Sequence, residues 1–183
     1  MIRRTHSLQV ISFYRFVQIS NKSKLKDKFN YFLKGKLLRG TILISDEGIN
    51  GSLSGEGTIL HEVIKFIRRE LKIRNLNCKI NETSFLPFNR LKVRIKKEIV
   101  SLGKDKIDIN KYRGELISPE KWASVIKNKN TKVIDVRNSY EIEIGKFSGA
   151  LNPRTNNFRE FPSSLKKMKI KKTDSLALYC TGG

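Results

Sequence analysis

The last residues of the chain are the ones best suited to chemistry. They read Leu178-Tyr179-Cys180-Thr181-Gly182-Gly183, an apolar run that leads into a cysteine and two glycines. The apolar run predicts a buried strand, which places the Cys180 thiol at the end of that strand. Thr181, Gly182 and Gly183 favour a turn in which backbone N–H groups converge, and such a turn suits a thiolate. The alternative is a strand-end cysteine with a structural role only.

Other reactive side chains are few and isolated. Cys78 lies between Asn77 and Lys79 in a segment expected at a sheet edge, and we interpret it as incidental. His6 and His61 have no partner near them in sequence. Two cysteines cannot form a disulfide framework, and no Cys/His spacing predicts a metal site. No flavin or haem signature is present either, so the sequence predicts no bound cofactor.

The charge of the chain points to a polyanionic partner. Lys and Arg number 38 against 17 Asp and Glu, which leaves a formal net charge of +21. Nucleic acid is the commonest partner of such a surface. The competing interpretation is compositional drift, because the chain is rich in Lys, Ile and Asn throughout.

The most regular basic pattern follows Arg90. Apolar residues at 91, 93 and 95 alternate with basic ones, which predicts a half-buried strand with a basic outer face. An RNA-binding face and a solvated strand exterior both remain open here. If RNA binds, we expect phosphate contacts, since no aromatic pattern typical of RNA-binding sheets is evident. The candidate nucleic-acid-binding residues are Arg90, Lys92, Arg94, Lys96 and Lys97.

The elements of the first half alternate in a recognisable order. Periodicity predicts strands at Leu8–Val17, Gly40–Ile44, Ile49–Leu53 and Leu91–Lys96, and helices at Lys22–Leu33 and Gly57–Leu71. The order βαββαβ is the ferredoxin-like pattern, which hosts many functions and by itself identifies none.

The second half predicts a parallel α/β sheet. Ser118 is a suitable N-cap for a helix with Pro119 at its first position. Strands are expected at Lys132–Arg137 and Ser175–Tyr179, the second apolar enough to be buried on both faces. We predict a first domain over residues 1–103, a linker over 104–115 and a second domain over 116–183.

Four stretches carry a resemblance to known proteins. Asp135-Val136-Arg137, with Glu141 and the run Gly145–Pro153 after it, resembles the opening signature of rhodanese-like sulfurtransferase domains, and Leu178–Gly183 resembles their active-site loop. Gly40–Ser52 and Pro87–Val100 are similar to a rarer domain. Together they resemble the rhodanese-domain, oxygen-dependent tRNA uridine hydroxylases, over nearly the whole chain.

The resemblance implies an α/β protein with a ferredoxin-like N-terminal domain that binds RNA and a rhodanese-like domain after it. It implies hydroxylation of the wobble uridine of tRNA to 5-hydroxyuridine, with dioxygen as co-substrate and the anticodon loop as the bound part. Cys180 would be the catalytic residue, Thr181, Gly182 and Gly183 its loop, and Asp135 and Arg137 supporting residues. A cytoplasmic enzyme is expected, because no segment has the apolar length of a signal peptide or membrane span.

One departure from the family bears on activity. The family's loop continues past Gly183 with an isoleucine, an arginine and a second cysteine, so we expect a truncated, incomplete rhodanese-like domain in this chain. Inactivity, or a separate chain that carries the missing portion, is the consequence expected. Two other functions stay open: a sulfurtransferase with a cysteine persulfide, and a non-catalytic remnant that binds RNA.

Overall fold

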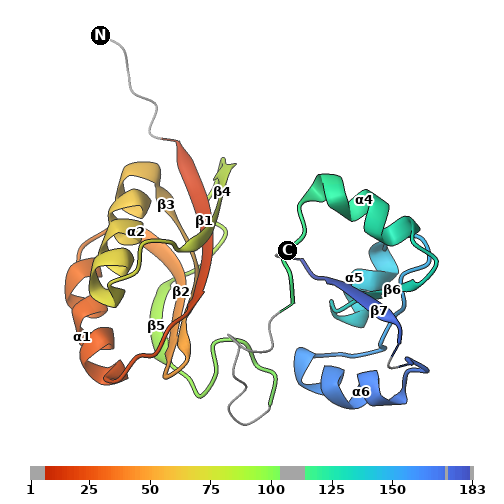
Figure 1. The fold of residues 1–183 in the computed structure, drawn as a ribbon. Helices are drawn as coiled ribbons and strands as arrows, with labels where there is room; N and C mark the ends of the chain where they lie inside the picture. The colour runs from red at the N-terminus through yellow and green to blue at the C-terminus, as the bar shows by residue number, and fades with distance from the viewer. Residues whose placement is uncertain (1–6, 104–113, 172, 182–183) are drawn as a thin grey trace. The chain divides into compact units, whose positions relative to one another are not determined.

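The computed structural model describes residues 7–103, 114–171 and 173–181. The chain folds into two compact units, Met1–Val100 and Ser101–Gly183, drawn in Figure 1. Most of the linker predicted at 104–115 lies outside the described residues. Within those residues, no helix is long and apolar enough to cross a membrane.

The first unit is built on one five-stranded sheet with the strand order β4-β1-β3-β2-β5. Neighbouring strands are antiparallel, except that β5 runs parallel to β2 at one edge. The elements are β1 (Leu8–Phe16), α1 (Lys22–Leu33), β2 (Leu38–Ser45), β3 (Gly48–Glu56), α2 (Gly57–Leu71), β4 (Asn77–Thr83) and β5 (Leu91–Ile95).

The ferredoxin-like βαββαβ order is confirmed, but its last strand is not the one that the sequence predicts. The closing strand is β4, which pairs with β1, whereas the predicted strand at Leu91–Lys96 forms a fifth, outer strand beside β2. The apolar pattern does not reveal β4, because an edge strand needs little apolar surface. Its sequence, NCKINET, leaves five of its seven residues exposed.

Both helices lie on the same face of this sheet (Figure 1). They pack there because Leu25, Phe29 and Leu33 recur at helical spacing in α1 and Leu60, Val63 and Ile67 do so in α2. These side chains meet Ile11 and Phe13 of β1 and their neighbours across the sheet in one core. The opposite side of the sheet, called the helix-free face below, carries the alternate residues of each strand.

The second unit contains a two-stranded parallel sheet, as predicted for this half of the chain. Its elements are α4 (Pro119–Lys127), β6 (Thr131–Asp135), α5 (Ser139–Ile144), a 3-10 helix (Phe158–Glu160), α6 (Phe161–Lys167) and β7 (Ser175–Tyr179). The Ser118 side chain accepts a hydrogen bond from the Lys121 backbone N–H, so the predicted N-cap is confirmed.

The expectation that Ser175–Tyr179 is buried on both faces is wrong. Ala177 is the one buried residue of β7, whereas Leu176 and Leu178 are 41% and 48% exposed. Ala177 and Tyr179 face Trp122, Val125 and Ile126 of α4. Among the described residues, the leucines on the other face lack a comparable cover, so two residues of apolar sequence remain in contact with solvent.

Candidate active site

Cys180 lies directly after β7, where its side chain is exposed. It borders a cavity of about 480 Å³, called the active-site cavity below. Two parts of the second unit supply the wall: the segment that follows β6 and the end of β7. The lining residues are Arg137, Gly145, Lys146, Phe147, Tyr179, Cys180 and Thr181.

Strand register places a buried carboxylate beside the cysteine's strand. Asp135 is opposite Tyr179 in the β6–β7 pairing and is fully buried. The Tyr179 hydroxyl donates a hydrogen bond of 2.5 Å to Asp135 Oδ2. Burial by itself would raise the pKa of the Asp135 carboxyl, but hydrogen bonds from Arg137 and Tyr179 outweigh it and hold that pKa below its ordinary value.

Arg137 connects this carboxylate to the cavity. Its Nε donates to Asp135 Oδ1 at 2.9 Å and its Nη2 to Asp135 Oδ2 at 2.7 Å, a two-pronged pairing that fixes the guanidinium plane. Nη2 also donates to the Gly145 carbonyl at 2.5 Å. The hydrogen bonds to Asp135 raise the pKa of Arg137. The cavity therefore has a permanent positive charge in its wall.

Tyr179 joins the sheet to the aromatic side of the cavity. Its hydroxyl accepts a hydrogen bond from the Phe147 backbone N–H at 3.2 Å. The rings of Tyr179 and Phe147 are 4.9 Å apart, edge to face, and Trp122 lies 5.9 Å from Tyr179. Burial, followed by the hydrogen bond to Asp135, raises the pKa of Tyr179. Tyr179, the residue before Cys180, is therefore held by hydrogen bonds to Asp135 and Phe147 and by ring contacts with Phe147 and Trp122.

Thr181, the residue after Cys180, is also held by a hydrogen bond, to Glu141. Glu141 and Asn138 form a capping box at the start of α5. The hydroxyl of Thr181 donates to Glu141 Oε1, and this hydrogen bond is the main reason that the pKa of Glu141 lies below its ordinary value. Cys180 is therefore flanked on both sides by residues with fixed partners, while its thiol faces the cavity.

The structure brings together four of the predicted site residues: Cys180, Thr181, Asp135 and Arg137. Gly182 and Gly183 of the predicted loop lie outside the described residues. Sequence reasoning missed the anchoring roles of Tyr179 and Glu141. Tyr179 was hidden in an apolar run, and only the pairing of the two strands reveals that its hydroxyl meets Asp135.

The predicted nucleic-acid-binding residues lie in the first unit, in and around the outer strand β5. Lys92 and Arg94 point to the helix-free face, because they alternate with Leu91 and Val93 of the core side. Arg90, Lys96 and Lys97 are exposed at the two ends of this strand. The positive charge of Arg90 lowers the pKa of Lys92, as expected for cations that crowd one edge.

Metal-binding geometry is not found in the part of the chain that the structure describes: no three His, Cys, Asp or Glu side chains gather there. The described cavity residues instead offer a thiol, a fixed guanidinium, an ammonium group and two aromatic rings. That set suits an anionic or flat, polar ligand held beside a nucleophile.

Known proteins are similar to this chain over most of its length. A family model described as the UPF0176 acylphosphatase like domain matches residues 8–99. A tRNA uridine(34) hydroxylase of Wolbachia pipientis wMel is 38% identical over 177 residues, which are 97% of this chain and 64% of that protein. The tRNA uridine(34) hydroxylase of Rickettsia bellii (strain OSU 85-389) is 37% identical over 180 residues, 98% of this chain and 73% of its own length.

Among solved structures, an acylphosphatase from Coxiella burnetii aligns with a TM-score of 0.36 and 12% identity, over 51% of this chain and all of that one. The chain spans less than two thirds of the length of the Wolbachia relative. The family model covers half of the chain, and the Rickettsia relative matches over nearly three quarters of its length. The chain belongs to the tRNA uridine(34) hydroxylase family, with the UPF0176 acylphosphatase like domain as its first part.

Proposed function

We propose that this chain is an RNA-modifying oxidoreductase that hydroxylates the wobble uridine of tRNA at ring carbon 5. The observation that carries the proposal is an exposed Cys180 beside a cavity whose wall holds Arg137 in a fixed orientation. The names of its relatives support the substrate. The base to be modified must be unstacked, and an anticodon loop presents such a base without melting a duplex.

The residues of the cavity have distinct roles in this proposal. Cys180 is the catalytic residue that touches the base, and Thr181 follows it in the cavity wall. Arg137 binds negative charge on the substrate, and Asp135 is a positioning residue that holds Arg137 through two hydrogen bonds. Phe147 and Tyr179 supply an apolar wall against which a pyrimidine ring can lie. Dioxygen is the co-substrate: one of its atoms becomes the hydroxyl oxygen on carbon 5 and the other leaves as water. The two electrons and two protons come from an external thiol reductant, which is oxidised to a disulfide, and no resident cofactor is part of the proposal.

The second proposed partner is a separate rhodanese-like chain that packs on the outer face of β7. The exposed Leu176 and Leu178 support it, because a covering element would remove both from water. In this arrangement the outer face of β7 is an intermolecular contact and the proposed enzyme works in the cytoplasm as a complex.

The proposal is tested in bacteria that lack their own pathways to 5-hydroxyuridine. The chain, alone or with a partner chain, is expressed there and tRNA nucleosides are measured by mass spectrometry. We expect 5-hydroxyuridine to appear, to vanish in Cys180→Ser and to persist in Cys78→Ser. The Cys78 variant is the matched control because the chain has two cysteines and Cys78 lies in β4 of the first unit.

Two outcomes would contradict the proposal. Equal 5-hydroxyuridine in Cys180→Ser and in the unchanged chain would remove the catalytic role of that thiol. Turnover of thiosulfate by the purified protein without any effect on tRNA nucleosides would favour the sulfurtransferase instead.

A further inference from the structure

We propose that the helix-free face of the first unit's sheet binds single-stranded RNA, with phosphates at its two edges and bases across its middle strands. The inference rests on the proposed function only in taking RNA as the partner. The sequence already indicated Lys92 and Arg94 at one edge as phosphate contacts. The structure adds the face that extends from them across the sheet, the stacking of bases on Tyr14 and the cation Lys79 at the opposite edge.

Register defines which side chains share this face. Ser12 pairs with Lys79 on one side and with Ser52 on the other. Ser52 pairs with Thr41, which in turn pairs with Lys92. A straight row across all five strands therefore reads Lys79, Ser12, Ser52, Thr41 and Lys92. It has a cation at each end and three hydroxyl groups between them.

The neighbouring row adds an aromatic ring. Tyr14 lies between Asn77 and Asn50, and this row ends in Leu43 and Arg94 on β2 and β5. The Tyr14 ring is 6.2 Å from Phe16 in an edge-to-face arrangement on the same side of β1. A base that stacks on Tyr14 would have the exposed Asn77 amide within reach on one side, whereas Asn50 on the other side already donates to the Ile99 carbonyl. Stacking on an aromatic side chain is how sheets that bind RNA hold unpaired bases.

The charge of the face suits RNA. Arg39, Lys79, Lys92 and Arg94 all belong to it by register, with Arg90 just before β5. Of the residues that the five strands place on this face, one is acidic. It is Glu56, at the end of β3, where its carboxylate accepts a hydrogen bond of 2.6 Å from Thr58.

Two segments border the row and leave it accessible. The Arg39 side chain reaches the carbonyl of Phe88, in the connection between β4 and β5. Beyond β5 the chain returns so that Asn50 Nδ2 donates to the Ile99 carbonyl at 2.8 Å. Between these contacts Ser12 and Lys79 are exposed and Thr41, Ser52 and Lys92 are half-buried.

Size and chemistry favour a single strand over a duplex or a protein. Four interstrand spacings of about 4.8 Å separate the edges, so the row is about 19 Å long. That width is comparable to the sheets on which two or three unpaired bases stack. The middle of the row is hydroxyl-rich rather than apolar, whereas a protein partner would favour an apolar centre.

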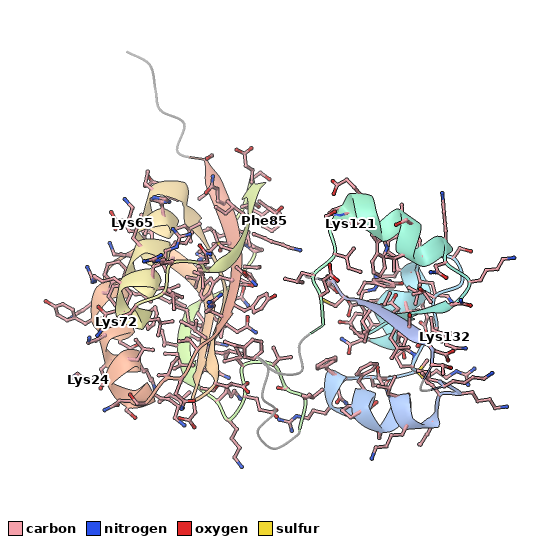
Figure 2. All side chains as sticks on the ribbon, viewed as in Figure 1. Lys24, Lys65, Lys72, Phe85, Lys121 and Lys132 are labelled. Atoms are coloured by element: carbon pink, nitrogen blue, oxygen red, sulfur yellow. The ribbon has the colours of Figure 1, made fainter. Side chains whose placement is uncertain are left out.

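The test measures binding of the full chain to a fluorescein-labelled dodecameric oligouridine by fluorescence anisotropy over a range of salt concentrations. The double variant K92E/R94E reverses two charges on the face. Its matched control, K24E/K65E, reverses two exposed lysines on α1 and α2, on the helix-covered side (Figure 2). A second comparison pairs Tyr14→Leu with Tyr31→Leu, since Tyr31 of α1 is 86% exposed.

We expect K92E/R94E to weaken binding about tenfold or more and to reduce the slope of log K against log salt by about 1.4, which corresponds to two phosphate contacts. The K24E/K65E variant should lose much less affinity for oligouridine. Tyr14→Leu should lose about fivefold or more with an unchanged salt slope, because stacking carries no charge, and Tyr31→Leu should lose nothing.

Equal losses in the two charge-reversal pairs would overturn the inference, since binding would then follow net charge alone. A dimer that dissociates in K92E/R94E, with RNA affinity intact, would assign the face to a second copy of the chain and overturn it as well. The assay needs no hydroxylation, so oligouridine binding at this face together with absent 5-hydroxyuridine would contradict the proposed function while the inference stands.

Discussion

At the scale of single residues, the second unit depends on one buried charge and the groups that compensate it. Asp135 is inaccessible to solvent, yet it accepts hydrogen bonds from the Arg137 side chain, the Arg137 backbone and the Tyr179 hydroxyl. A carboxylate so fully satisfied is a poor proton acceptor, which argues against a role as a general base. Its contribution is positional, because it keeps the Arg137 guanidinium in the cavity wall beside Cys180.

Removal of this charge should destabilise the second unit. Asp135→Asn leaves Arg137 without its ionic partner and is expected to cost about 3 kcal/mol of unfolding free energy. The single tryptophan of the chain, Trp122, packs against Tyr179 and reports unfolding of this unit by fluorescence in urea. Asp174→Asn is the matched control. Its carboxylate lies 3.7 Å from Lys132 in a partly exposed pair, and its loss should cost below about 1 kcal/mol.

The same groups predict how this unit responds to pH. The pKa of Asp135 is lower in the folded state than in the unfolded chain, so its stabilising contribution is present above about pH 4 and is lost as the pH falls through the folded pKa. The pKa of Tyr179 is raised, so its contribution is present below about pH 10 and is lost above that. Urea midpoints from Trp122 fluorescence should therefore fall at both extremes. In Tyr179→Phe the alkaline decline should diminish, and an unchanged alkaline decline would contradict this assignment.

At the scale of elements, one glycine decides how closely β2 and β3 approach. Gly40 has a φ of +127°, and a Cβ added there would lie 2.1 Å from the Ser52 carbonyl oxygen and 2.8 Å from Leu53 Cα. Both atoms are backbone and cannot move aside. This pairing also sets the Thr41–Ser52 step of the helix-free face.

We expect Gly40→Ala to lower the unfolding free energy of the first unit by at least about 2 kcal/mol. The measurement is urea unfolding followed by far-UV circular dichroism. Gly35→Ala is the control that separates the cost of a positive φ from the cost of a steric clash. Gly35 also has a positive φ, +76°, but no atom lies within 4 Å of the added Cβ, so about 1 kcal/mol is expected. Equal effects of the two substitutions would mean that the close approach of the strands is unimportant.

Helices and strands with a periodic apolar pattern were predictable from the sequence, whereas a strand that forms only by pairing with a neighbouring strand was not. The helices Lys22–Leu33 and Gly57–Leu71 have the predicted bounds, because each carries a continuous apolar stripe. β4 has no such stripe and exists because β1 offers it an unpaired edge. In the site, the Asp135–Arg137 spacing is visible in the sequence, whereas the approach of Tyr179 depends on pairing across 44 residues. The place of Tyr14 between Asn77 and Asn50 likewise depends on strand pairing that its own segment does not reveal.

At the scale of the whole molecule, the two units differ in how much apolar surface they bury. Among the described residues, eighteen buried apolar side chains lie in the first unit and six in the second. Each fully buried side chain of this kind contributes roughly 1.5–3 kcal/mol. The second unit relies instead on the polar contacts of Asp135 and on the Trp122, Phe147 and Tyr179 rings.

This difference predicts two unfolding transitions. The Trp122 fluorescence midpoint should lie at a lower urea concentration than the far-UV circular dichroism transition, to which α1 and α2 contribute the longest helices. Phe29→Ala assigns the second transition. Phe29 is fully buried in the first core, so its truncation should cost about 3–5 kcal/mol and shift the circular dichroism midpoint. Coincident urea midpoints by fluorescence and circular dichroism would contradict the prediction that the second unit is less stable than the first. A Trp122 midpoint that rises when a partner chain is added would instead place that partner on the second unit, because a ligand stabilises the fold that it binds.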